Sequence, residues 1–318
     1  MQDIVKIGVI GAGNMGKNHI RVIRELSNLY KLVGFFDNSS GNVKKTKEIF
    51  DIKNFNSIEE LIKNVDAVII AVPSSLHKEI GVAVANSKVH ALIEKPIALS
   101  KEDGLVICEE FEKNKKILMV GHIERYNPVI GEVAKILENE EVIAIEARRC
   151  SPYDPRVADA SVIMDLMIHD IDLVFNKLYK KEIENISARG ISVKSNKIDY
   201  INSIIKHKTG IITSIVASRV TEEKVRTVNI HTKNSYIKAD LLNRTLEISR
   251  KTSYTLNIGY NSTYKQENIL EKIMVPTIEP LKEELKAFHN SIKFNKSEVT
   301  GEEAVRNVEI ASQIEKQL

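Results

Sequence analysis

Cysteine is scarce in this chain, which has only two, Cys108 and Cys150, among its 318 residues. They lie far apart in the sequence, and no Cys-x-x-Cys pair occurs. A zinc site built on paired cysteines, or a dithiol redox centre, is therefore not indicated. Isolated cysteines are usually small buried hydrophobes, and we expect each of these to be one rather than a nucleophile.

Long apolar runs are missing as well. No run approaches the ~18 residues that a membrane-spanning helix needs. The N-terminus enters a strand pattern almost at once and shows no basic and apolar leader. We therefore expect a cytoplasmic protein with no membrane partner.

Charge of one sign is not in excess. The net charge is +3 and the sequence pI is about 8.6. Lysines and acids are interspersed, and stretches such as Lys44, Lys45 and Lys47 are typical of solvated helix faces. Because no basic stripe runs along the chain, nucleic acid is not an expected partner.

Strand and helix patterns alternate over residues 1–122. This rhythm predicts an α/β domain of the Rossmann type, with a doubly wound parallel sheet. A total of 318 residues leaves room for a second domain over residues 123–318. The strands expected in the first domain are residues 4–10, 32–36, 66–72, 90–94 and 117–121.

Residues 123–318 become strand-rich after a helix expected at 125–138. Runs of Val, Ile, Thr and Tyr at hairpin spacing predict an α+β domain with a large, open, mostly antiparallel sheet. Helices on one face would leave the other face to be covered, most simply by a second copy, which predicts a homodimer or homotetramer. The expected strands are 142–149, 186–193, 200–207, 210–219, 226–232, 235–240, 246–248 and 255–257, and the expected helices are 164–178, 280–294 and 301–317.

A glycine-rich turn joins the first strand to the first helix. Gly11 allows a tight turn, Gly13 lets the backbone approach a pyrophosphate, and Gly16 lets the helix pack on the strand. The helix N-terminus then offers N–H groups to phosphates. The alternative is a sharp turn of purely structural role. The residues of this turn expected to bind the cofactor are Gly11, Gly13, Asn14, Met15 and Gly16.

Asp37 ends the second expected strand, about 20 residues past the glycine turn, where an acid binds a ribose 2′-hydroxyl. Its charge would repel the 2′-phosphate of NADP. Residues 38–40 offer no arginine to hold that phosphate, although Lys44 or Lys45 would favour NADP if either reached across. The pattern predicts NAD as the cofactor.

Lys95 follows the strand expected at 90–94 and precedes Pro96. Proline biases the preceding residue away from helix, so Lys95 is held at a strand end. That is the ligand side of a parallel sheet, beside the expected nicotinamide. The alternative is an ordinary surface lysine.

Asp165 and His169 lie four residues apart in an otherwise apolar helix, with Asp172 near the same face. Burying a carboxylate and an imidazole among apolar residues is costly unless they pair or face a polar cleft. His169 is suited to accept a hydroxyl proton near neutral pH. A helix-stabilising Asp–His pair and a metal site are the alternatives; a metal is not expected, because no further His or Cys cluster accompanies them.

Polar and basic residues gather at the start of the second domain. Arginine forks suit a diphosphate, while scattered surface arginines are the alternative. The residues concerned are Arg125, Tyr126, Asn127, Arg148, Arg149, Tyr153 and Arg156.

Taken together, these motifs resemble the Gfo/Idh/MocA oxidoreductase family over nearly the whole chain. The resemblance rests on the glycine turn, on Glu94-Lys95-Pro96, on Val120-Gly121-His122 and on Asp165-x-x-x-His169. It implies that Lys95, Asp165 and His169 are the catalytic group. It also implies that Ser74, His77 and Glu94 contact or neighbour the cofactor.

Within that family, the stretches 122–128, 147–149 and 155–156 resemble the UDP-N-acetylglucosamine 3-dehydrogenases. The resemblance implies a UDP-sugar substrate, with Arg125, Tyr126, Asn127, Arg149 and Arg156 as binding residues beside Asp165 and His169. The sequence departs from this subgroup at 158–161, where an arginine and a glycine are missing.

These observations lead to the hypothesis of an NAD-dependent dehydrogenase that oxidises a secondary sugar hydroxyl. His169 would take the hydroxyl proton, Asp165 would orient His169, and Lys95 would hydrogen-bond the substrate oxygen. Two alternatives remain open. One is a dehydrogenase of the same fold acting on inositol or a free sugar, and the other is a non-catalytic dinucleotide-binding regulator.

Overall fold

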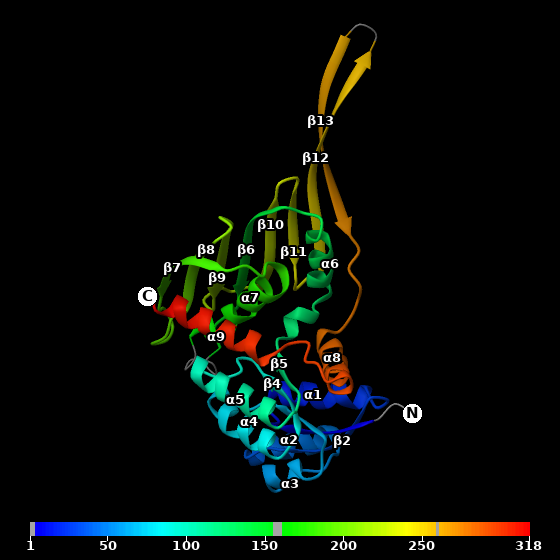
Figure 1. The fold of residues 1–318 in the computed structure, drawn as a ribbon, viewed down its shortest axis with the longest axis vertical. Coiled ribbons are helices and arrows are strands. Elements are labelled where there is room, and N and C mark those ends of the chain that lie inside the picture. Colours follow the sequence, from blue (N-terminus) through cyan, green and yellow to red (C-terminus); the bar gives the residue numbers. More distant parts are fainter. Residues whose placement is uncertain (1–3, 155–160, 259–260) are drawn as a thin grey trace. The chain divides into compact units, whose positions relative to one another are not determined.

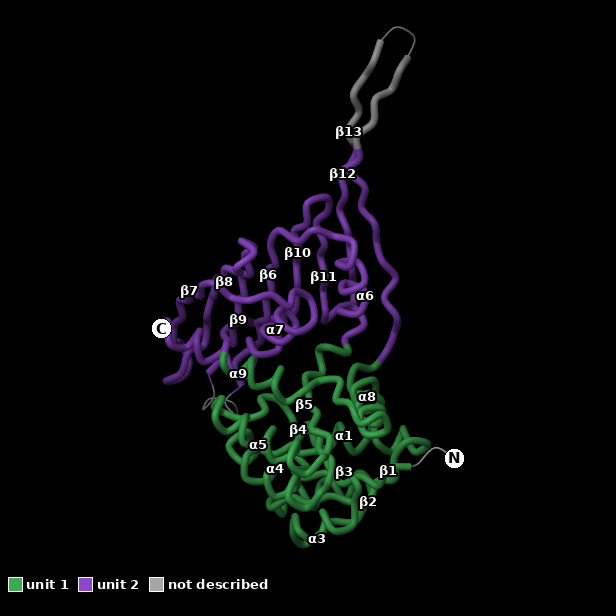
Figure 2. The backbone as a smooth tube through the Cα atoms, in the orientation of Figure 1, with its two compact units in different colours: residues 1–126, 279–309 green, residues 127–278, 310–318 purple. Residues whose placement is uncertain are grey.

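The chain forms two compact units, coloured separately in Figure 2. Unit 1 comprises Met1–Tyr126 and Glu279–Glu309, and unit 2 comprises Asn127–Ile278 and Ile310–Leu318. The sequence-based division placed everything from residue 123 onward in the second domain, whereas the structure returns residues 279–309 to the first unit. The structure is a computed structural model that describes residues 4–154, 161–258 and 261–318.

Unit 1 is built on a parallel sheet. Its strands, within the described residues, are β1 (Val5–Ile10), β2 (Tyr30–Phe36), β3 (Ala67–Ile70), β4 (His90–Glu94) and β5 (Leu118–Gly121). They lie in the order β2-β1-β3-β4-β5, so the direction of winding reverses between β1 and β3. Every residue of β3 is buried, as expected for a sheet with helices on both faces. The doubly wound α/β domain predicted from the sequence is confirmed.

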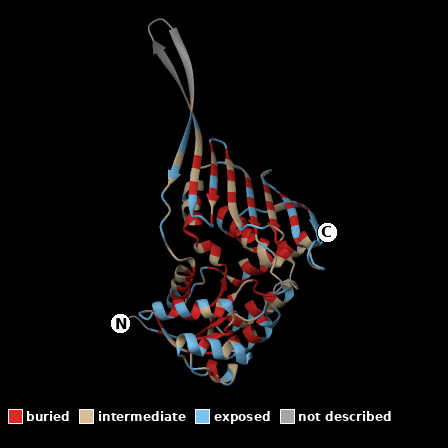
Figure 3. Cartoon of the chain, turned by 180° about the vertical axis from the view of Figure 1, so that it is seen from behind, coloured by how far each residue is buried: buried red, intermediate tan, exposed pale blue. Residues whose placement is uncertain are grey.

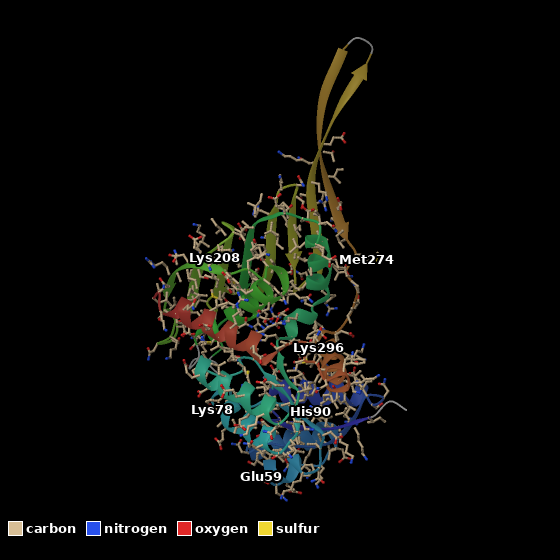
Figure 4. The ribbon with its side chains drawn as sticks, in the orientation of Figure 1. Glu59, Lys78, His90, Lys208, Met274 and Lys296 are labelled. Carbon is tan, nitrogen blue, oxygen red and sulfur yellow. The ribbon has the colours of Figure 1, made fainter. Side chains whose placement is uncertain are left out.

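Helices follow the strands of this sheet. Ser57 caps one of them, since its Oγ accepts from the Glu60 N–H at 3.1 Å, while the Glu60 carboxylate reaches back to the N–H of Asn56 at 3.0 Å. Lys78, labelled in Figure 4, forms a 2.7 Å ion pair with Asp103 on the surface. The helices are α1 (Asn14–Glu25), α2 (Ser40–Phe50), α3 (Ile58–Ile62), η1 (Ser74–Leu76), α4 (His77–Asn86), α5 (Lys101–Lys113) and η2 (Ile123–Tyr126).

Helix α8 (Pro280–Phe294) explains why the chain returns to unit 1. It packs against α1, β5 and η2 (Figure 1). The Tyr30 hydroxyl donates to the Leu285 carbonyl at 2.6 Å, and Arg21 on α1 pairs with Glu279 just before α8. These contacts join residues more than 250 positions apart, which no local pattern reveals. Helix α9 (Gly301–Glu315) then divides between the units, with residues 301–309 in unit 1.

Unit 2 contains the large open sheet. Its neighbours pair antiparallel except for β6 and β9, which pair in parallel. The order among the described strands is β13-β12-β11-β10-β6-β9-β8-β7. These strands are β6 (Val142–Cys150), β7 (Ile183–Ile191), β8 (Tyr200–His207), β9 (Ile212–Ser218), β10 (Val225–Thr232), β11 (Ser235–Asp240), β12 (Thr245–Ile258) and β13 (Asn261–Ile273).

One face of this sheet forms the core of unit 2. Along β8, Ile201 and Ile205 are buried while Ile204 between them is 51% exposed, and Figure 3 shows the same alternation on the neighbouring strands. Strands with a period of two bury one face only. The buried face packs against α6 (Pro128–Leu137), the π-helical turns η4 (Ile163–Met167) and η5 (Leu173–Leu178), and α7 (Ile168–Asp172).

The hairpin of β12 and β13 differs from the sequence-based expectation. Two short strands were expected at 246–248 and 255–257, whereas the structure has one continuous β12, paired along its length with β13. No strand was expected at β13. The sequence of Asn261–Ile273 is mostly polar and lacks the apolar alternation that identifies a half-buried strand.

Both cysteines are buried, as expected. Burial raises the pKa of the Cys108 thiol to about 12, so it is not a nucleophile near neutral pH. Among the described residues, no helix has the length and apolarity needed to cross a bilayer.

Candidate active site

The glycine turn of unit 1 has the geometry that a dinucleotide requires. Gly11 has φ +89°, and a Cβ there would lie 2.5 Å from the Ala71 carbonyl oxygen. A Cβ on Gly16 would lie 1.9 Å from the Gly11 carbonyl oxygen, so α1 packs directly on the turn. A Cβ on Gly13, by contrast, would meet no described atom within 4 Å. The backbone at Gly13 is therefore open on the side where a pyrophosphate binds.

The N-terminus of α1 supplies the charge for a phosphate. Gly13 is its N-cap and offers no side chain to the first-turn N–H groups. These groups, from Asn14, Met15 and Gly16, have no partner within the helix and carry the positive end of its dipole. No acid lies in the first turn to occupy them. The turn thus fits a diphosphate.

Asp37 lies at the wall of a pocket of about 440 Å³ beside this turn. The Ala12 N–H donates to Asp37 Oδ2 at 2.6 Å, and the Ser39 N–H donates to Oδ1 at 2.7 Å. Asn42 Nδ2 also donates to Oδ2, at 3.2 Å. A carboxylate has about four lone-pair sites, so Asp37 is fixed in place and can still accept from a ribose hydroxyl.

The charges of this pocket favour NAD over NADP. Asp37 and Glu79 are acidic, and none of the described residues that line it is lysine or arginine. Lys44 and Lys45 are exposed on α2 and are not among the lining residues. A 2′-phosphate would therefore meet two carboxylates without a cation to hold it.

His77 and Ser74 follow β3, and neither lines the described pocket. The His77 ring is fully buried, with Nε2 3.0 Å from the Val72 carbonyl and Nδ1 2.9 Å from the Pro96 carbonyl. It therefore ties the loop after β3 to the loop after β4. Ser74 begins η1 and is half-buried.

Glu94 and Lys95 end β4 and begin the loop. His19 on α1 donates from Nε2 to Glu94 Oε1 at 2.7 Å, and the Glu94 side chain is 12% exposed. Burial acts to raise the pKa of Glu94, but His19 and the charge of Lys95 together lower it. Lys95 is half-buried at the carboxyl end of its strand, where the sequence places it.

His19 is a site residue that the sequence analysis missed. It lies on the buried face of α1 with Gly16, Ile20 and Ile23. A histidine inside an apolar helical stripe is a detectable signal, because burial is costly unless a partner is present. What it could not indicate is the partner, since Glu94 is 75 residues away.

Asp165 and His169 lie in unit 2, on η4 and α7 respectively. Both are half-buried, whereas Ile163, Met167 and Ile168 around them are fully buried. The π-helical turn widens the helix at this point, a feature frequent at functional sites. Asp165 and His169 are thus exposed enough to contact a ligand.

Asp172 is buried, unlike Asp165 and His169. It is 1% exposed, and its Oδ1 accepts from Asn176 Nδ2 at 3.1 Å. Among the described residues, no group of three or more His, Cys, Asp or Glu side chains has the arrangement of a metal site.

Arg149 was expected to bind substrate, but the structure gives its guanidinium another partner. It is 2% exposed and donates from Nε and Nη2 to the two carboxylate oxygens of Asp170, both at 2.9 Å. A buried guanidinium requires such a bidentate carboxylate. Arg149 therefore anchors the residue next to His169 to strand β6, and its binding of a diphosphate stays a prediction.

Arg125 and Asn127 are likewise engaged in the fold. Arg125 is 9% exposed and donates from Nη1 to Glu303 Oε2 at 2.6 Å. Asn127 caps α6, since its Oδ1 accepts from the Val129 N–H at 3.1 Å, and its Nδ2 donates to the Leu241 carbonyl at 3.2 Å. These contacts tie both residues to the fold, and their binding of a substrate stays a prediction.

The remaining expected residues have mixed positions. Tyr126 is half-buried at the end of η2, and Arg148 is exposed on β6. The Arg219 guanidinium lies 5.8 Å from the ring centre of Tyr153. Arg156 lies outside the described residues.

Known proteins resemble this chain in sequence and in fold. Residues 5–122 match the model of the oxidoreductase family with an NAD-binding Rossmann fold, Gfo/Idh/MocA. UDP-N-acetylglucosamine 3-dehydrogenase from Acidithiobacillus ferrooxidans is 31% identical over 79% of this chain and 79% of its own length. Myo-inositol 2-dehydrogenase from Thermotoga maritima is 27% identical over 68% of this chain and 69% of its own.

A solved structure extends the likeness to both units. The structure of UDP-N-acetylglucosamine 3-dehydrogenase GnnA from Acidithiobacillus ferrooxidans aligns with a TM-score of 0.88 and 28% identity. The alignment covers 99% of this chain and 97% of that one. On this similarity in sequence and fold, the chain belongs to the Gfo/Idh/MocA family of oxidoreductases, whose first domain is an NAD-binding Rossmann fold.

Proposed function

We propose that the protein is an NAD-dependent dehydrogenase that oxidises a secondary hydroxyl of a sugar. The proposed substrate is UDP-N-acetylglucosamine, and the proposed position of oxidation is its C3 hydroxyl. The observation that carries the substrate is the similarity to the UDP-N-acetylglucosamine 3-dehydrogenase over 252 residues. In a chain of 318 residues, a continuous span of that length includes Lys95, Asp165 and His169 wherever it begins.

His169 is the proposed general base. A histidine titrates near neutral pH, and this one is half-exposed, so it can take a proton from a bound hydroxyl. Asp165, four residues earlier, would orient the ring and favour its protonated form. Arg149 supports this arrangement through Asp170, the neighbour of His169.

Lys95 is the proposed partner of the substrate oxygen. Its ammonium group would hydrogen-bond the oxygen and stabilise alkoxide character as the proton leaves, an effect worth a few kcal/mol when the charge is already in place. Bound NAD would accept the hydride. The residues that would hold it are the backbone of Gly11 to Gly16 and the carboxylate of Asp37.

The proposed substrate-binding residues are Arg125, Tyr126, Asn127, Arg149, Arg156, Asp165 and His169. Three of them, Arg125, Asn127 and Arg149, also support the fold through Glu303, Leu241 and Asp170 respectively.

The outer face of the unit 2 sheet is the proposed contact with further copies, in a homodimer or homotetramer. Ile143 is 54%, Ile204 51% and Ile212 49% exposed on this sheet. Placing charge there, with Ile204→Glu, should lower the molar mass measured by light scattering. An unchanged mass for Ile204→Glu, or a monomeric wild type, would contradict this contact.

The test of the substrate is a panel of UDP-sugars, free sugars and inositol, with NADH absorbance as the signal. The proposal expects turnover of UDP-N-acetylglucosamine and little with N-acetylglucosamine alone, because the diphosphate contributes binding. Turnover of inositol or a free sugar with the same kcat/KM as UDP-N-acetylglucosamine would refute the proposal of a nucleotide-sugar substrate. The similarity to myo-inositol 2-dehydrogenase makes inositol the second candidate.

A further inference from the structure

Glu284 is a buried acid that the proposed reaction does not use. It lies on α8 between the buried residues Leu281 and Leu285, and its exposed fraction is 0%. Neither of its carboxylate oxygens has a hydrogen-bond partner among the described residues. Burying such a group costs free energy, and an apolar residue of similar size would fit this helix face without that cost.

The charged neighbour that acts on Glu284 is Glu94, the residue before Lys95. His19 holds one side of the Glu94 carboxylate, through the 2.7 Å bond to Oε1. The other ring nitrogen of His19, Nδ1, is buried and has no partner among the described residues. Two helices and one strand of unit 1 thus contribute to one polar cluster, with His19 from α1, Glu94 from β4 and Glu284 from α8.

Strand β5 closes the cluster on another side. Gly121 pairs with Glu94 across the sheet, and a Cβ on Gly121 would lie 3.3 Å from Glu94 Oε2. Glu94 is therefore confined by His19 at Oε1 and by the β5 backbone at Oε2. The orientation of the Glu94 carboxylate then depends on the hydrogen bonds that its other neighbours donate to it.

The pKa values of the two carboxyl groups are shifted in opposite directions. Burial raises the pKa of Glu284 well above its usual range, and the Glu94 carboxylate raises it further. Glu94 keeps a lowered pKa because His19 and Lys95 offset its burial. The pKa of Glu284 is thus raised and that of Glu94 lowered, an arrangement seen where carboxyl groups have distinct roles.

We propose that Glu284 is a positioning residue for Lys95: as a neutral carboxylic acid it donates its proton toward the Glu94 carboxylate and so fixes the end of β4. The cluster then holds one negative charge beside the Lys95 cation instead of two. This inference rests on the proposed function of Lys95 for its catalytic consequence, but the protonation of Glu284 is independent of it.

Protonation is tested by comparing unfolding of the wild type and Glu284→Gln across about pH 5 to about pH 8. In this interval the unfolded chain releases the Glu284 proton and the folded chain keeps it. The folding equilibrium constant of the wild type should therefore fall about tenfold per pH unit relative to Glu284→Gln, which has no proton to lose. Glu283→Gln is the matched control, because Glu283 is a partly exposed neighbour paired with Lys286. Parallel curves for the wild type and Glu284→Gln would overturn the proposal.

Positioning is tested with Glu284→Leu and Glu284→Gln. The leucine variant should be at least as stable as the wild type, because it removes a buried group without a partner. Its kcat should nevertheless fall at least about tenfold with NADH affinity unchanged, and Glu284→Gln, which can still donate, should restore kcat. The ¹⁵N shifts of the His19 ring should move in Glu284→Leu and stay in place in Glu284→Gln.

The outcomes separate two failures. Unchanged His19 shifts and unchanged kcat in Glu284→Leu would overturn the positioning role. A wild type that oxidises no sugar would contradict the proposed function instead, and the unfolding and ¹⁵N measurements would still decide whether Glu284 is a neutral donor to Glu94.

Discussion

Unit 2 buries arginines beside aspartates, whereas unit 1 buries glutamates near a lysine. Arg149 meets Asp170 and Arg219 meets Asp199, with each side chain at most 2% exposed. Asp199 also accepts from the backbone N–H groups of Val193, Lys194 and Ser195. In unit 1, Glu284 has no hydrogen-bond donor among the described residues.

This difference separates two uses of buried charge. A matched ion pair fixes geometry, since removing one partner leaves an uncompensated charge. An acid without a hydrogen-bond partner destabilises the fold and so points to a function. We expect substitutions in the unit 2 pairs to affect stability, and substitutions around Lys95 to affect turnover.

The largest expected effect is on the Arg149–Asp170 pair. Asp170→Ala should lower the free energy of unfolding by about 3–5 kcal/mol, because it leaves a buried guanidinium unpaired. Chemical denaturation measures this, and the double variant Arg149→Met, Asp170→Leu should recover most of the loss. If the free energy of unfolding of Asp170→Ala lay within about 1 kcal/mol of the wild-type value, the pair would not be a fixed anchor.

Substitutions of Lys95 and His169 should instead lower turnover and leave stability unchanged. Lys95→Ala and His169→Asn should each reduce kcat by at least ~100-fold and leave NADH binding and stability near wild type. Steady-state kinetics with NADH fluorescence titration as the control measures both. Near-wild-type turnover in either variant would remove that residue from the catalytic group.

Acid should weaken unit 2 through Asp199. Burial acts to raise the pKa of Asp199, but three backbone N–H donors and Arg219 lower it well below its usual range. A depressed pKa adds stability above the unfolded value, near pH 4, and this is lost as pH falls further. The free energy of unfolding should then decline by up to about 1.4 kcal/mol per pH unit below about pH 4. Asp199→Asn should flatten this decline, while the same change at exposed Asp51 should not.

The cofactor pocket should respond more modestly. Asp37→Ser removes the charge that opposes a 2′-phosphate, so the preference for NADH over NADPH should fall about tenfold. Fluorescence titration of both cofactors measures it, with Glu79→Gln as the comparison. Tighter NADPH than NADH binding by the wild type would refute the assignment of Asp37.

The smallest effect is expected at the surface pair of Lys78 and Asp103, at 48% and 38% side-chain exposure. Lys78→Ala should change the free energy of unfolding by less than about 1 kcal/mol, because solvent screens exposed charges. A larger loss of unfolding free energy would contradict the expected difference between buried and exposed ion pairs.

Local patterns were sufficient for much of the fold and for part of the site. The strand β8 and the helix α8 follow from periodicity, and the structure confirms them. The glycine turn was equally predictable, because Gly11 and Gly16 leave no room for a Cβ and Gly13 leaves the backbone open. Contacts between residues far apart in the chain could not be predicted in this way, as with Arg149 and Asp170 or His19 and Glu94, nor could the burial of Glu284.

The sequence by itself determined the order of the helices and strands outside the β12–β13 hairpin, and it indicated the cofactor turn and the acidic Asp37, because each rests on residues close together in the chain. The tertiary structure decided that α8 belongs with unit 1, that Arg149 is held by Asp170, and that Glu284 is buried within electrostatic range of Glu94. Those outcomes depend on burial and on partners far apart in sequence, since the free energy of a buried charge is set by what surrounds it and not by its neighbours along the chain.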